Sequence, residues 1–313
     1  MTDYYFERLS DSNLSHLVYL YRHAFNHKTD LSFLNRKYNT QMFGKQFIGY
    51  LAFEKQTKMP AAYYGVFPIK CKLNNTFILA AQSGDTMTHP KHQGKGLFIQ
   101  LAKLTFDLAA KEDIEFVFGF PNKNSYPGFI RKLNWQHYAD INNYVIKTGA
   151  IPLDKIVKKF AFLSRIYEAF VSQSLKKIAT ESTLENSLSL QLPEAGYVVH
   201  DSNFYTYKSY HKIHLVNIKG VKCVVKVDGR LWVGDMDACD EITFGKTLIH
   251  LKALAEKLSC ASIQFSVFQN SPLDLYLQKH LEPKSKNPVC SLNLSNKINS
   301  TSFAYQALDF DTY

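Results

Sequence analysis

One stretch decides the fold, residues 77–135, which reads FILAAQSGDTMTHPKHQGKGLFIQLAKLTFDLAAKEDIEFVFGFPNKNSYPGFIRKLNW. Residues 78–87 are mainly apolar and predict a strand, and 97–111 carry leucines at helical spacing. The glycine-rich turn 91–96 lies between them. A helix that starts at such a turn presents free N–H groups and the positive end of its dipole, and Lys91 and Lys95 add charge. The pattern predicts a binding site for a pyrophosphate.

The spacing of the glycines in the turn shows which known type of phosphate-binding loop it matches. A dinucleotide-binding fingerprint requires a third glycine where Ile99 stands, and no G-x-x-x-x-G-K-[ST] occurs in the chain. Residues 93–98 instead resemble Q-x-x-G-x-[GA], the acyl-CoA pyrophosphate loop of the GNAT N-acetyltransferase superfamily. Phe98 departs from the pattern, because the family usually has Gly or Ala there.

The resemblance covers roughly residues 4–138. Residues 116–120 are similar to the strand that splays from its neighbour in that family, and 121–124 to the turn that follows it. Residues 131–135 resemble the closing E-K-x-G-F, with Asn134 and Trp135 in place of Gly and Phe. The resemblance implies an α/β (α+β) fold with a mixed, mostly antiparallel sheet, in which a splayed strand pair holds acyl-CoA.

Composition limits the other possibilities. The 313 residues carry a net charge of +10, which suits nucleic acid, an anionic membrane surface or a polyphosphate cofactor, or simply a solvated basic face. No nucleic-acid-binding motif is present, and no apolar stretch is long enough to span a membrane. We therefore expect a cytoplasmic protein without nucleic acid. The cysteines are scattered, so neither a disulfide framework nor a metal site is expected: Cys71, Cys223, Cys239, Cys260 and Cys290.

The chain is expected to consist of a catalytic domain (1–148), an amphipathic helix with a linker (149–195) and a second domain (196–313). The helix is predicted over 151–177 and is basic and amphipathic. Such a helix can lie on an anionic membrane, but packing against its own domain is the favoured interpretation. The polar residues 179–195 are interpreted as the linker.

The second half resembles a degenerate copy of the first. A strand (230–236), a helix (244–258), a strand (262–268) and an Asn- and Pro-containing turn follow in the same order. The segment that corresponds to the phosphate turn, however, contains Asp237, Asp240 and Glu241. Carboxylates would repel a pyrophosphate, so this half is not expected to bind CoA.

The resemblance also implies roles for particular residues. The end of the central strand would form hydrogen bonds with the pantetheine chain, and the glycine turn would bind the pyrophosphate. The asparagines after the splayed strand would contact cofactor or substrate. The implied cofactor-binding residues are Met87, Thr88, Gln93, Gly94, Lys95, Gly96, Leu97, Phe98, Asn122 and Asn124.

The catalytic acid and base are less clear in the sequence. Ile130 aligns with the tyrosine that the family often uses as acid, and Tyr126 lies one helical turn earlier. We expect Tyr126 to protonate the thiolate, the alternative being a packed aromatic. Asp85, on the central strand, is the candidate base, and a structural carboxylate is an equal alternative. Solvent can also serve as base.

The expected function is transfer of an acetyl or other short acyl group from acyl-CoA, chiefly acetyl-CoA, to a primary amine. The acceptor would be a small polar molecule such as an amino sugar, attacking directly in a ternary complex. The alternative is a non-catalytic acyl-CoA-binding or scaffold protein.

Overall fold

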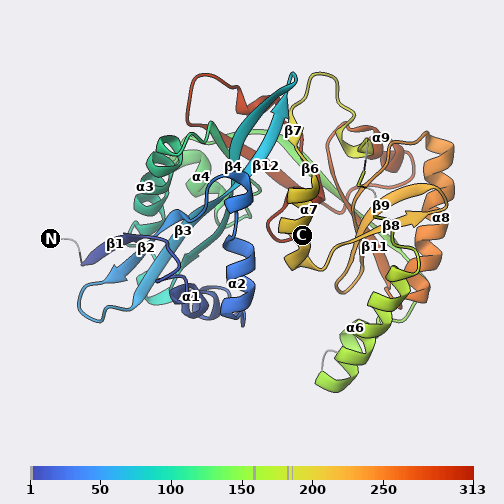
Figure 1. Ribbon diagram of the computed structural model, residues 1–313, viewed down its shortest axis with the longest axis horizontal. Helices are drawn as coiled ribbons and strands as arrows, with labels where there is room; N and C mark the ends of the chain where they lie inside the picture. The colour runs from blue at the N-terminus through green and yellow to red at the C-terminus, as the bar shows by residue number, and fades with distance from the viewer. Residues whose placement is uncertain (1–2, 158–159, 182, 185) are drawn as a thin grey trace. The chain divides into compact units, whose positions relative to one another are not determined.

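The computed structural model describes residues 3–313 except 158–159, 182 and 185 (Figure 1). The chain forms two compact units, neither of which is a continuous segment. Unit 1 consists of the chain up to Tyr138 together with 203–210 and 288–303, and unit 2 of 139–202, 211–287 and 304–313. The domain boundaries expected from the sequence remain a prediction.

The sheet of unit 1 is mostly antiparallel. Its strands, in spatial order, are β1 (Tyr4–Arg8), β2 (Ile48–Glu54), β3 (Pro60–Leu73), β4 (Thr76–Thr88), β5 (Phe116–Gly119) and β12 (Ser285–Asn293). Only β4 and β5 run parallel, and α3 (Leu97–Lys111) connects them. Residues 290–293 of β12 pair antiparallel with β5, so the end of the chain completes this sheet.

Two separate hydrophobic cores lie on the two faces of that sheet. Helices α3 and α4 (Tyr126–Lys132) pack on one face, and α1 (His16–Ala24) and α2 (Leu31–Tyr38) on the other (Figure 1). The alternation of β3 explains the division, because Tyr64 belongs to the first core and its neighbour Tyr63 to the second. The shorter helices are η1 (Gln41–Phe43), η2 (Pro90–His92), α7 (Ser202–Lys208), η4 (Ser209–His211) and η5 (Ser300–Ser302).

Unit 2 repeats the plan of unit 1. Its strands, in spatial order, are β8 (His214–Ile218), β9 (Val221–Val227), β10 (Leu231–Met236), β11 (Ser262–Phe268) and β6 (Gln136–Lys147). The parallel pair β10 and β11 is connected by α8 (Glu241–Lys257), and β6 pairs antiparallel with β11. The remaining elements are α5 (Leu153–Val157), α6 (Ala161–Lys176), η3 (Leu188–Leu190), β7 (Tyr197–Val198), α9 (Pro272–Gln278) and η6 (Ala307–Asp309).

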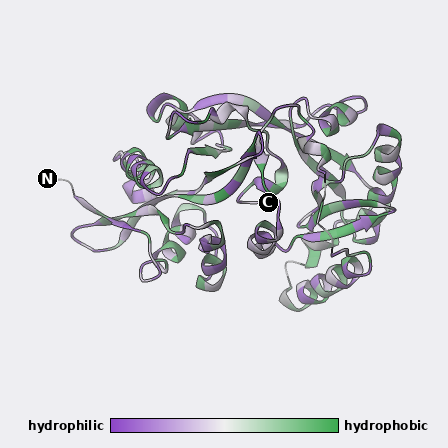
Figure 2. Cartoon of the chain, turned by 45° about the horizontal axis from the view of Figure 1, so that its top comes forward, coloured by the Kyte–Doolittle hydropathy of each residue, from purple (hydrophilic) through white to green (hydrophobic). Residues whose placement is uncertain are grey.

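The predicted fold class, a mixed and mostly antiparallel sheet with helices, is confirmed, and the second half repeats the plan of the first as expected. The helices carry both hydrophobic and hydrophilic residues (Figure 2). Three details differ from the sequence-based expectation. The helix predicted over 151–177 consists of α5 and α6, and within 179–195 Leu188 and Ser189 are buried. The units also exchange their last strands: β6 follows α4 of unit 1 but lies mostly in unit 2, whereas most of β12 lies in unit 1.

Candidate functional site

The two parallel strands of unit 1 part at their carboxyl ends. The pairing of β4 with β5 ends at Gln82 and Phe118, whereas β4 continues as far as Thr88. The β4 residues beyond Gln82 pair with β3 on their other side. One edge of β4 is thereby separated from β5 over the six residues that lead into the glycine turn, which is the splay expected from the sequence.

A β-bulge accompanies the parting of the strands. Asp85 and Thr86 both lie opposite Tyr64, between the pairs Gly65–Gly84 and Tyr63–Met87. Asp85 has a φ of 52°, a left-handed conformation that few non-glycine residues adopt. An extra residue bends and twists its strand, so the bulge redirects the end of β4.

Buried side chains from α2 hold the bulge. The Lys37 Nζ donates to Asp85 Oδ1 at 2.7 Å, and the Tyr38 hydroxyl donates to Oδ2 at 2.9 Å. The side chains of Lys37 and Asp85 are only 4% and 6% exposed. Burial, followed by the charge of Asp85, raises the pKa of Tyr38 well above its ordinary value, so its phenol remains a donor. Both carboxylate oxygens of Asp85 therefore already have a donor.

The glycine turn is shaped by backbone rather than by side chains. Gly94 and Gly96 have φ angles of 75° and 76°, which suit glycine. Gly96 is the N-cap of α3, and within the described residues no side chain caps this helix. A Cβ atom would meet nothing within 4 Å at Gly94 and only the Gln100 amide at 3.5 Å at Gly96. The start of α3 thus offers uncapped N–H groups below open space, which fits a bulky phosphate.

The side chains of the predicted loop divide into exposed and buried ones. Gln93 and Lys95 are exposed, whereas Leu97 lies in the core and Phe98 packs against Tyr64 and Phe129. Leu97 and Phe98 can therefore contribute to ligand binding mainly through their backbone. The same holds for Met87 at the end of β4, whose side chain is buried on the opposite face.

Basic and aromatic groups surround the turn. The Lys95 Nζ lies 5.7 Å from the centre of the Tyr4 ring, and the hydrogen bond with Tyr4 raises the pKa of this lysine. The Lys91 N–H donates to His89 Nδ1 at 3.2 Å, so that His89 shapes the turn. Burial, and then the neighbouring His23, lower the pKa of His89. The charge at the turn therefore comes from lysines.

Tyr126 and the two predicted asparagines lie around the start of α4. The Tyr126 hydroxyl is 3.0 Å from Nδ1 of His137. The Asn122 Oδ1 accepts from the backbone N–H groups of Asn124 and Ser125, at 2.9 and 3.1 Å. The Asn122 oxygen thus stabilises its own turn. The side chains of Asn122 and Asn124 are exposed.

In unit 2 the point where the two parallel strands part is occupied by another segment of the chain. The pairing of β10 with β11 ends at Val233 and Phe265, and a register shift follows at Gly234. There the ring of Tyr313 packs so closely that a Cβ on Gly234 would lie 2.6 Å from it, and η6 packs against both β10 and β11. The start of α8 is capped by Asp240, whose carboxylate accepts from Thr243 N at 2.7 Å. A carboxylate thus occupies the anion position of this helix.

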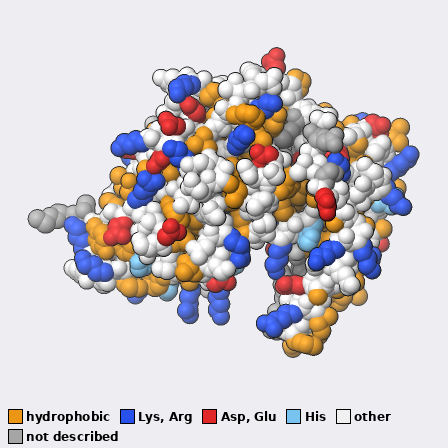
Figure 3. Space-filling view, viewed as in Figure 1, with side chains coloured by type: hydrophobic (Ala, Val, Ile, Leu, Met, Phe, Trp, Pro, Cys, Tyr) orange, Lys and Arg blue, Asp and Glu red, His pale blue; other side chains and the backbone are white. Residues whose placement is uncertain are grey.

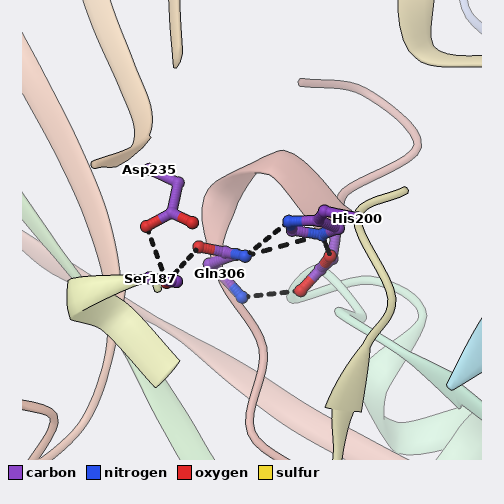
Figure 4. Close-up of polar contacts among 5 residues, drawn as sticks. Ser187, His200, Asp235 and Gln306 are labelled. Carbon is purple, nitrogen blue, oxygen red and sulfur yellow. Dashed lines mark hydrogen bonds and ion pairs between the residues drawn. The ribbon is translucent and has the colours of Figure 1, made fainter. Parts of the chain in front are cut away.

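Polar contacts hold that C-terminal segment in place (Figure 4). The Ser187 hydroxyl donates to Asp235 at 2.8 Å, and the Gln306 amide donates to His200 Nδ1 at 3.0 Å. The His200 Nε2 donates to Asp309 at 2.7 Å. Ser187 and His200 thus bond to different carboxylates, which is not the chain of a Ser–His–Asp triad. A cavity of about 320 Å³ lies beside the cluster. Among the described residues, no three His, Cys, Asp or Glu side chains gather as metal ligands.

Asp235 is the most perturbed carboxyl group of this cluster. It is 1% exposed, and burial raises its pKa to about 6, against the opposing effects of His200 and Ser187. Its Oδ2 has no hydrogen-bond partner among the described residues. Asp235 therefore becomes protonated at a higher pH than an ordinary carboxyl group, which makes this region sensitive to pH.

Known proteins share features with both the sequence and the fold. Residues 6–138 match the family model of the acetyltransferase (GNAT) domain. A GCN5-related N-acetyltransferase from Kribbella flavida has a similar structure, with 10% identity, a TM-score of 0.57 and coverage of 93% of this chain and 72% of the other. A second, from Anabaena variabilis, has 12% identity, a TM-score of 0.52 and coverage of 93% of this chain and 73% of the other. A third, from Sphaerobacter thermophilus, has 13% identity, a TM-score of 0.50 and coverage of 96% of this chain and 99% of the other.

These likenesses extend over both units, so the fold of the whole chain occurs in known structures. At such low identities they show the fold alone. No curated protein matches the sequence. None of the helices in the described part of the chain has the length and apolarity that crossing a membrane requires.

Proposed function

We propose that this protein transfers an acetyl group from acetyl-CoA to the primary amine of a small polar acceptor, since residues 6–138 match the family model of the acetyltransferase (GNAT) domain. The observation that carries the proposal lies within unit 1. There the edge of β4 freed by the splay leads directly into an uncapped, glycine-lined helix start. An acyl donor with a pyrophosphate at one end and an extended amide chain at the other matches that succession.

The proposed binding roles fall on two neighbouring segments, the end of β4 and the glycine turn. The backbone from Gln93 to Phe98 binds the pyrophosphate, and the β4 backbone at Met87 and Thr88 bonds the pantetheine amides. The amine nitrogen attacks the thioester carbonyl carbon, the C–S bond breaks, and the acetyl group becomes an amide. The ammonium proton passes to solvent, and the departing thiolate takes a proton from the enzyme.

Tyr126 is the proposed proton donor. Its hydroxyl is bonded to His137, a group that can replace the proton after each turnover. Asn124, exposed at the turn before α4, is the proposed contact for cofactor or substrate, because the oxygen of Asn122 already serves the turn. As the acceptor we propose an amino sugar or another small polar amine.

For Asp85 we propose a positioning role in place of the base expected from the sequence. Both of its carboxylate oxygens accept hydrogen bonds inside unit 1, one from Lys37 and one from Tyr38, so neither is placed to meet an amine. Its contacts instead hold the left-handed backbone of the bulge, and thereby the direction of β4. Solvent then accepts the proton of the amine.

The decisive experiment is a thiol-release assay with acetyl-CoA against panels of amino sugars, amino acids, polyamines and peptides. We expect CoA release that depends on one class of amine, strongest for amino sugars, above the rate without acceptor. The alternative, a non-catalytic acyl-CoA-binding protein, is favoured by Ile130 in place of the usual tyrosine. Tight binding of acetyl-CoA in calorimetry without turnover of any amine would establish that alternative.

A further inference from the structure

Helix α6 has two apolar faces, of which unit 2 uses only one. Tyr167, Val171 and Leu175 contact the core of unit 2, and the Tyr167 hydroxyl donates to the Leu258 carbonyl at 2.7 Å. These residues recur at intervals of four, as one face of a helix requires. They anchor the second half of α6 to the unit.

The other apolar face is exposed to solvent. It consists of Phe162, Leu163, Ile166 and Phe170, which we call the outer stripe, and Phe162 is 74% exposed. At 3.6 residues per turn, the four side chains fall within an arc of about 100°. The preceding segment continues this character with Ile151, Leu153, Ile156 and Phe160, all exposed.

This concentration is unusual for the chain. Of the fifteen large apolar side chains that are exposed in the described residues, eight lie between Ile151 and Phe170. Single exposed apolar residues need no explanation, but a contiguous group marks an interaction surface. Figure 3 shows hydrophobic side chains gathered with Lys and Arg at the projecting end of α6.

Basic residues accompany the outer stripe. The sequence from 151 to 177 contains six Lys or Arg residues and only two acids, Asp154 and Glu168. Arg165 and Lys176 are exposed and, by helical spacing, border the stripe on the side away from the core. Glu168 is paired with Lys212 at 3.0 Å, so that its charge is offset. The surface thus combines an apolar strip with a positive border.

We propose that α5 and α6 dock on an anionic lipid surface, with the outer stripe in the acyl boundary and the basic residues at the head groups. An amphipathic helix with a cationic border binds in this way through apolar burial and attraction to anionic lipid. A second copy of this chain would place two basic segments against each other, which their like charges oppose. The inference is independent of the proposed chemistry.

The test is co-sedimentation of the full chain with vesicles. We expect binding to vesicles of equal parts phosphatidylcholine and phosphatidylglycerol, weaker binding in high salt, and little binding to phosphatidylcholine alone. Equal binding to neutral and anionic vesicles would overturn the role of charge, and no binding to either would overturn the proposal.

A pair of variants tests whether the outer stripe is responsible. Phe162→Gln with Ile166→Gln should lower the vesicle partition coefficient by about tenfold or more. The matched control is Ile242→Gln with Ile249→Gln on α8, which are 73% and 67% exposed and lie outside the stripe; it should bind as the wild type does. Equal losses in both variants would refute the assignment. Light scattering that shows a dimer dissociated only by the stripe variant, without vesicle binding, would identify a second copy as the partner instead.

Discussion

Replacing Lys37 with Met should destabilise the protein by about 3–5 kcal/mol, the typical cost of removing one partner of a buried ion pair. The methionine fills a similar volume, so the loss comes from the charge left on Asp85 rather than from a cavity. That carboxylate would retain only the Tyr38 hydroxyl at 2.9 Å. Its burial, with 6% of the side chain exposed, leaves little access for compensating water.

The control is Lys45→Met, which removes one of the two cationic partners of Glu112 and leaves the other, Arg8, at 3.1 Å. The Lys45–Glu112 pair has a similar length, 3.0 Å, but its side chains are 31% and 24% exposed. A pair so accessible to solvent contributes about 0–1 kcal/mol. Urea unfolding of both variants, followed by circular dichroism, measures the difference directly.

The double variant Lys37→Met with Asp85→Asn completes a double-mutant cycle for this ion pair. Asparagine tolerates the left-handed backbone at position 85 and carries no charge, so much of the stability should return. If Lys37→Met lowers the free energy of unfolding no more than Lys45→Met does, the Lys37–Asp85 ion pair does not hold the bulge. If Asp85→Asn keeps full stability and acetyl-CoA affinity but abolishes turnover, Asp85 is the base and the positioning role is wrong.

Four further results are expected. In calorimetry, Gly96→Glu should abolish CoA binding while Gly96→Ala, which has the same backbone strain, retains most of it; equal affinities would contradict the phosphate turn. Tyr126→Phe should lower kcat by ~10²-fold or more with little change in acetyl-CoA affinity, and an unchanged kcat would assign the acid elsewhere. Equilibrium dialysis should give one CoA per chain, because in unit 2 Asp240 caps α8 and Tyr313 packs against Gly234 where β10 and β11 part; a stoichiometry of two would contradict that assignment. The raised pKa of Asp235 means that its protonated form adds stability which is complete below the ordinary carboxyl pKa and is lost as pH rises through about 6. Asp235→Asn should remove this component, worth about 3 kcal/mol, from unfolding curves measured between pH 4 and about 7, and an unchanged pH profile would show that the carboxyl is not perturbed.

The sequence predicted the elements whose patterns are local. Helix α3 was expected at 97–111 and occupies those residues, and the central strand expected over 78–87 extends from Thr76 to Thr88. Glycine spacing, leucine periodicity and an apolar strand each act within a few residues, so they can be read without the fold. The acidic start of α8 was likewise visible in the sequence.

The contacts that complete the site are not local. Lys37 lies 48 residues before Asp85 and, as a lysine in an amphipathic helix, resembles an ordinary surface residue. No pattern indicated that it would be buried, although an aspartate in the middle of a strand was a signal that a partner was needed. The packing of Tyr313 against Gly234 was equally hidden, because the two residues lie far apart in the sequence and belong to no shared pattern.

The exchange of last strands has a consequence for synthesis on the ribosome. Strand β5 of unit 1 ends at Gly119, but the residues of β12 that pair with it are 290–293, much later in the sequence. At a translation rate of roughly 5–20 residues per second, the intervening chain takes on the order of 10–30 s to make. During that time the aromatic edge of β5 has no native partner and is open to pairing with other nascent chains. Ribosome stalling just after residue 148 should therefore yield an aggregation-prone fragment, and native unit 1 should form only after residues 290–293 have been made.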